Sequence, residues 1–248
     1  DTFNTALGFN AGALVTTGIN NTLIGGLAGD ALTDADRNVA IGKTALGADT
    51  LGSKAVAVGY HALENQNFTT ATDSHNTAVG YVAGNQISTG RYNTVLGSLA
   101  GDAITDGDWN VALGVNALTT DTLGSTSVAI GSNSLQQQNF TTATDAYNVA
   151  VGYNAGVAVT TGVENTLIGA NAGDSLTDAD SNVAVGYSAL TSDTLGSRTT
   201  AIGRFAGYNQ NFTTATDSHN TYVGYYSGAN VTTGVRNTII GSLAGDQA

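Results

Sequence analysis

An aspartate, a serine and a histidine stand next to one another at 73–75 and again at 217–219. These are the residue types of a hydrolytic triad, in which an acid orients a histidine base that activates a serine nucleophile. Side chains adjacent in sequence rarely face one another as a triad requires, and the corresponding segment at 145–147 reads Asp-Ala-Tyr. We therefore predict that the chain has no catalytic residues and is not an enzyme.

Aspartates gather in the segment GDALTDAD at 29–36, which recurs in related form at 101–108 and 173–180. Carboxylate oxygens on a turn could bind Ca²⁺. The spacing fits neither an EF-hand loop nor the glycine-rich calcium-binding repeat, and aspartate is a common turn residue. Three histidines and no cysteine are too few for a zinc cluster. The sequence therefore favours solvated turns and predicts no metal and no other cofactor.

Aromatic residues at two recurring positions are candidates for contacting a receptor protein or a glycan. One is the phenylalanine of a thrice-repeated segment, QNFTTATD, and the other is the tyrosine that follows a recurring glycine. The candidate contacts are Phe68, Phe140, Phe212, Tyr60, Tyr81, Tyr153, Tyr187 and Tyr225. A repeated exposed phenylalanine would promote aggregation, so we favour rings that fold back to fill enlarged loops. The tyrosines have the alternative of packing against neighbouring repeats.

The composition of the 248 residues excludes several classes of protein. Seven Lys and Arg against 19 Asp and Glu give a net charge of −12, with too few cations for a nucleic-acid partner. There is no cysteine for a disulfide scaffold, and no apolar run of about 20 residues for membrane insertion. With 41% hydrophobic residues, the chain is too apolar to be disordered. It starts without a methionine or a signal-like segment, so we expect a mature product or a piece of a longer protein.

The glycines reveal an internal repeat that must position all of these residues. The phrase Asn-Thr/Val-x-Ile/Leu/Val-Gly, with the Asn replaced in three copies, occurs 14 times, and its glycines are spaced by 17, 17, 17 and 21 residues in turn. Four copies make a 72-residue unit, so the chain divides into 4–75, 76–147, 148–219 and a partial unit, 220–248. Self-similarity at a short period is typical of a solenoid. We predict an all-β fold, a single parallel β-solenoid rod of 14 coils spanning 1–248.

Each phrase predicts a strand that is apolar on both faces. Side chains alternate along a strand, so the two branched positions share one face and the residue between them, mostly Ala, lies on the other. One face fills the coil, and another copy of the chain covers the other, where small Ala allows close approach. Later in each coil we predict a second short strand, with Val15, Ile87, Val159 and Val231 pointing inward. Stacked at about 4.8 Å, the coils would make a rod roughly 65 Å long.

Asparagine opens the phrase in 11 of the 14 copies. Stacked coils would align these amides in a ladder, each bonding the backbone or the asparagine of the next coil. We therefore predict a structural role rather than a catalytic one for these residues. The ladder comprises Asn4, Asn21, Asn38, Asn76, Asn93, Asn110, Asn148, Asn165, Asn182, Asn220 and Asn237.

The phrases at 38–46 (NVAIGKTAL), 76–84 (NTAVGYVAG) and 127–135 (SVAIGSNSL) resemble the head repeats of YadA-like trimeric autotransporter adhesins. Similar repeats occur in bacteriophage tail fibres. The resemblance implies a left-handed parallel β-roll, three chains side by side about a common axis, no catalytic residues and a surface-binding role. This chain departs from the adhesins in its longer coils and four-coil superperiod, and in having no neck, coiled-coil stalk or membrane anchor. These departures favour a viral fibre segment.

The expected function is a non-enzymatic structural and attachment rod. We expect a homotrimeric tail-fibre segment at the extracellular virion surface that adheres to a host, whose partners are two further copies of itself and a host-surface glycan or protein. The alternative is the head of a bacterial trimeric autotransporter adhesin on the bacterial outer surface. An ice-binding solenoid is a lesser alternative, because paired threonines such as Thr16-Thr17 occur in only one coil type of four.

Overall fold

The computed structural model describes residues 2–246, which form one long parallel β-sheet wound into a solenoid. The sheet has 14 strands of three residues, hydrogen-bonded in the order in which they follow along the chain. The strands are β1 (Thr5–Leu7), β2 (Thr22–Ile24), β3 (Val39–Ile41), β5 (Val56–Val58), β7 (Thr77–Val79), β8 (Thr94–Leu96), β9 (Val111–Leu113), β11 (Val128–Ile130), β13 (Val149–Val151), β14 (Thr166–Ile168), β15 (Val183–Val185), β17 (Thr200–Ile202), β19 (Thr221–Val223) and β20 (Thr238–Ile240). The prediction of an all-β parallel solenoid is confirmed.

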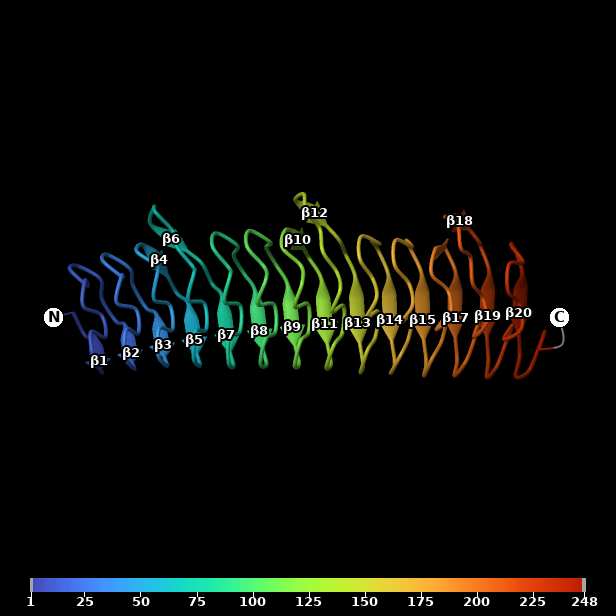
Figure 1. Cartoon of the computed structure of the whole chain (residues 1–248), viewed down its shortest axis with the longest axis horizontal. Helices are drawn as coiled ribbons and strands as arrows, with labels where there is room; N and C mark the ends of the chain where they lie inside the picture. The colour runs from blue at the N-terminus through green and yellow to red at the C-terminus, as the bar shows by residue number, and fades with distance from the viewer. Residues whose placement is uncertain (1, 247–248) are drawn as a thin grey trace.

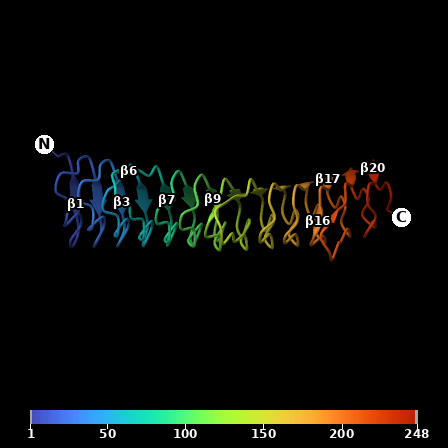
Figure 2. The same ribbon diagram turned by 90° about the horizontal axis from the view of Figure 1, so that it is seen from above.

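The coils stack into an elongated rod with the two termini at opposite ends (Figure 1), and the view from above shows the same narrow shape (Figure 2). The described residues contain no helix, and hence none long and apolar enough to cross a membrane. Neighbouring strands pair residue for residue, as where Thr5 pairs with Thr22 and Val56 with Thr77. Each phrase of the sequence is therefore one rung of the sheet.

Six further strands of two residues occur where the longer coils project from the rod, at the protrusions labelled β6, β12 and β18 in Figure 1. They pair as β4 (Gly52–Ser53) with β6 (Thr72–Asp73), β10 (Gly124–Ser125) with β12 (Thr144–Asp145), and β16 (Gly196–Ser197) with β18 (Thr216–Asp217). Each pair joins a longer coil to the coil before it.

The predicted second strand around Val15, Ile87, Val159 and Val231 is wrong, because these segments form turns and bends. The residues two and four positions after each phrase glycine have φ between +46° and +66°. Left-handed residues reverse the direction of the chain and cannot continue a strand. Ile87 and Val159 nevertheless point inward as predicted and are fully buried.

The core contains two inward positions that are never both large in the same coil. One is the middle strand residue, and the other lies four residues after the phrase glycine, where the chain has either Gly or Leu. In the second coil the strand supplies Leu23, whose Cδ2 lies only 2.8 Å from where a Cβ at Gly29 would be. In the third coil the strand supplies Ala40 and the turn supplies the buried Leu46. A large residue at one position thus requires a small one at the other.

The asparagine side chains tie successive coils together inside the rod. The Nδ2 of Asn38 donates to the carbonyl oxygen of Gly52 at 2.8 Å, and its Oδ1 accepts from the backbone N–H of Ala55 at 2.8 Å. The backbone N–H of Asn38 in turn donates to Oδ1 of Asn21 at 2.9 Å. Among the described residues, every buried side-chain nitrogen and oxygen has a hydrogen-bond partner. The ladder therefore satisfies backbone groups that water cannot reach.

Candidate functional site

The outward face of the 14-stranded sheet is a continuous apolar surface. From β2 to β19, each strand presents a Thr or Val and an Ile, Leu or Val on this face, and these side chains are half-buried or exposed. In the middle of the rod, Leu96 is 41% and Leu113 is 37% exposed. Large branched side chains are thus left facing solvent along the whole rod.

The prediction that small alanines lie on the face between chains is wrong. Ala112 and Ala129 point into the coil and are completely buried. The reason is that leucines from the turns, such as Leu118, fill the interior and leave room for little more than a methyl group on the strand. The face that needs a cover is therefore the branched one.

Cationic side chains border this apolar face, and Arg37, Lys54, Arg91 and Arg198 are each paired with an aspartate. Every Lys and Arg of the chain lies within three residues of a strand of the large sheet, on a chain whose net charge is −12. These residues are Arg37, Lys43, Lys54, Arg91, Arg198, Arg204 and Arg236. Lys54 forms a hydrogen-bonded ion pair with Asp73 at 2.6 Å.

The five predicted tyrosines form an interrupted row along one edge of the face, two residues after β5, β7, β13, β15 and β19. Tyr60, Tyr81, Tyr153, Tyr187 and Tyr225 are 41%, 56%, 56%, 48% and 44% exposed. The rings of Tyr60 and Tyr81 stack at 5.5 Å, and Arg204 lies 5.6 Å from the Tyr187 ring and 6.0 Å from the Tyr225 ring. These four rings contact side chains of neighbouring coils, and all five tyrosines present ring surface to solvent.

A second aromatic row, which the sequence analysis missed, lies at the other edge of the face. The rings of His75 and Tyr92 stack at 5.4 Å, and those of Tyr92 and Trp109 at 4.0 Å. The three residues occupy the same position in successive coils, immediately before the ladder asparagine. Reading down that column of the repeat would have revealed the stack.

Phe68, Phe140 and Phe212 are buried, with exposed fractions of 6%, 5% and 5%. Of the two interpretations open from the sequence, the structure has the one in which each ring folds back into its longer coil. The candidate role of these three residues as exposed receptor contacts is therefore wrong.

A buried carboxylate that the sequence analysis missed holds each of these loops. Oδ1 of Asp49 accepts hydrogen bonds from the backbone N–H groups of Gly52 and Phe68, each at 3.0 Å. Its Oδ2 accepts from Nε2 of Gln66 at 2.6 Å, and Oε1 of Gln66 accepts from Nδ2 of Asn76 at 2.8 Å. The same network recurs at Asp121 and Asp193. The signal in the sequence is that each aspartate stands one coil, 17 residues, before its glutamine.

The adjacent Asp, Ser and His do not converge. Asp73 pairs with Lys54, and the hydroxyl of Ser74 donates to the carbonyl oxygen of Ser53 at 3.2 Å. The ring of His75 stacks on Tyr92 instead. The three side chains thus have separate partners on the preceding or following coil.

The acidic turns connect coils as well. The hydroxyl of Thr89 donates to Asp106 at 2.5 Å, and the backbone N–H of Arg91 donates to Asp108 at 2.6 Å. Within residues 2–246 there is no group of three His, Cys, Asp or Glu side chains placed to hold a metal ion. The aspartates in these turns act as hydrogen-bond acceptors between adjacent coils.

Acidification from pH about 7 to about 4.5 should raise the melting temperature. Burial raises the pKa of Asp102 and Asp174 above 3.8. A raised pKa gives a contribution to stability that is complete below the unfolded pKa and lost as pH rises through the folded one. A hydrogen bond from Thr89 lowers the pKa of Asp106, and that contribution is lost only as pH falls below 3.8 through the lowered value. Circular dichroism melts measure the effect, and a fall of several degrees over this range would contradict it.

No family model matches the chain, and no curated protein is significantly similar to it in sequence. The surfaces of the rod are therefore the basis for inferring its function. The resemblance of its phrases to trimeric head repeats stays a prediction.

Proposed function

We propose that the chain is a non-enzymatic structural and attachment rod in which three copies pack side by side through their outward sheet faces. The observation that supports this most strongly is the uncovered apolar face, which runs through every coil. Its branched side chains are removed from water only if another surface covers them. A second copy offers an equally long face with the same spacing between coils.

The borders of the face also suit association of identical chains. Cations and tyrosine rings line its edges, and contacts between a cation and a ring gain strength when water is excluded. Such contacts already occur within the chain, where Lys43 lies 5.7 Å from the Tyr60 ring. We propose further contacts of this kind between the edges of adjacent chains.

The site of action follows from the resemblance of the phrases. We propose a segment of a bacteriophage tail-fibre type, at the extracellular virion surface, that holds a receptor-binding surface away from the particle and adheres to a host. A rod of stacked coils transmits position over its length because each coil is bonded to the next.

Charge placed in the outward face should separate the chains. Ile130→Lys with Val151→Lys puts two cations per chain where we propose an apolar interface, so the mass should fall from that of a trimer to that of a single chain. Ala71→Lys with Ala143→Lys is the matched control, because it adds the same charge on exposed loops and should leave the trimer intact. Light scattering gives the mass and circular dichroism the fold. A folded face variant that keeps the mass of the trimer would contradict the proposal.

A further inference from the structure

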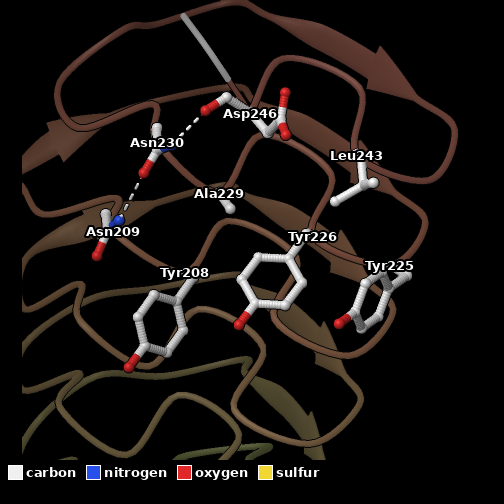
Figure 3. Close-up of a pocket in the computed structure, with 8 residues that line it drawn as sticks. All are labelled: Tyr208, Asn209, Tyr225, Tyr226, Ala229, Asn230, Leu243 and Asp246. Carbon is white, nitrogen blue, oxygen red and sulfur yellow. Dashed lines mark hydrogen bonds between the residues drawn. The ribbon is translucent and has the colours of Figure 1, made fainter.

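An open groove of about 510 Å³ lies near the C-terminal end of the rod, with Tyr225 of the tyrosine row among its lining residues. Its lining comes from the turns that follow β17, β19 and β20, so three successive coils contribute to it. The lining residues are Tyr208, Asn209, Tyr225, Tyr226, Ala229, Asn230, Leu243 and Asp246. Figure 3 shows tyrosine rings along one side and the two asparagines with Asp246 along the other.

The aromatic wall is held in place from behind. The ring centroids of Tyr208 and Tyr226 are 6.5 Å apart, and Phe205 packs against both at 5.1 and 4.7 Å. The guanidinium of Arg204 lies 4.5 Å from the Phe205 ring. Tyr226 has φ of +53°, a left-handed conformation that fixes the direction of its side chain. The rings thus form a prearranged apolar wall.

The opposite wall is a short ladder of amides. Nδ2 of Asn209 donates to Oδ1 of Asn230 at 3.0 Å, and Nδ2 of Asn230 donates to the backbone oxygen of Asp246. Each carboxamide has two N–H donors and two acceptor lone pairs. The two asparagines therefore retain donor and acceptor capacity beyond these bonds, and Asn230 is exposed.

The floor is low because Ala229 is small at a position that is larger in several other coils, as at Glu64, Gln136 and Val157. Ala229 is 3% exposed and lies at the bottom of the groove between the two walls. Here a small floor residue coincides with tyrosines at neighbouring positions.

We propose that this groove binds one ring of a neutral saccharide. The C–H groups of a pyranose face would lie against Tyr208 and Tyr226, and its hydroxyls would exchange hydrogen bonds with Asn209 and Asn230. An apolar wall with a few fixed polar groups, in a volume of this size, is typical of small-ligand sites. The carboxylate of Asp246 and the net charge of −12 disfavour acidic sugars. This inference rests on the attachment role proposed above.

The test is an array of immobilised neutral and acidic oligosaccharides probed with the full chain. Tyr208→Thr and Tyr226→Asn remove the wall with residues that the chain itself carries in equivalent coils, as at Thr119 and Asn154. We expect binding to at least one neutral glycan, weakened at least tenfold in either variant. Ala229→Gln, which fills the floor, should abolish it, and Tyr147→Ser, at an exposed tyrosine elsewhere on the rod, should leave it unchanged.

Three results would overturn the inference. They are no binding to any neutral glycan, binding that survives both wall variants, and equal loss in Tyr147→Ser. Light scattering on the same samples reports the trimer separately, so a failure of the groove is distinguishable from a failure of the assembly.

Discussion

Gly25→Ala should destabilise the rod by about 3–5 kcal/mol, whereas Gly26→Ala should change its stability by less than about 1 kcal/mol. Gly25 ends its strand with φ of +132°, a conformation that a residue with a side chain avoids. A Cβ there would lie 2.5 Å from the carbonyl oxygen of Gly42 in the next coil, and this oxygen accepts a hydrogen bond from the backbone N–H of Ala45. At Gly26 the nearest atom to such a Cβ is 4.0 Å away.

The adjacent glycines make a matched pair, because both changes add one methyl group in the same turn. Unfolding in guanidinium chloride, followed by circular dichroism, gives the two free energies. If the two variants lose similar amounts of stability, the close contact between coils at Gly25 does not require a glycine there.

Asp49→Asn should cost about 2–4 kcal/mol although it preserves shape. The carboxylate only accepts hydrogen bonds, and the amide that replaces its Oδ2 would point its N–H groups at the Nε2 donor of Gln66. Turning the Gln66 amide over does not help, because its nitrogen would then face the Nδ2 donor of Asn76. One buried donor is left without an acceptor in either arrangement.

Adding Gln66→Glu to Asp49→Asn should restore most of the lost stability. The new carboxylate accepts from Asn76 on one oxygen and from the new amide on the other, so donors and acceptors match again at the same net charge. The measurement is a double-mutant cycle on the free energy of unfolding. If the losses of stability in the two single variants simply add in the double variant, matching of donors and acceptors does not stabilise the loop.

The sheet was predictable from the sequence because each phrase glycine marks a strand end and the alternation of side chains follows from strand geometry. Which face of each strand points into the coil was not predictable. The alanines were assigned to the face between chains because the leucines that compete for the interior, such as Leu46, sit in turns with left-handed φ, a conformation that leucine seldom adopts. That same conformation removed the predicted second strand.

The candidate sites divide in a similar way. The tyrosine row was readable because its residues follow the phrase glycine directly. Asp49 looks like any other turn aspartate until it is compared with the residue one coil later. The groove depends on Tyr208, Ala229 and Asp246 meeting across three coils, and no repeat of the sequence marks that combination.

The most direct test of the account is the mass of the native chain in solution. If three copies cover one another's outward faces, light scattering coupled to size exclusion should give about 75 kDa, three times the 24.9 kDa of one chain. A mass near 25 kDa at micromolar concentration, with the circular dichroism of an intact β-fold, would show that the apolar face is stable in water by itself and would contradict the proposed assembly.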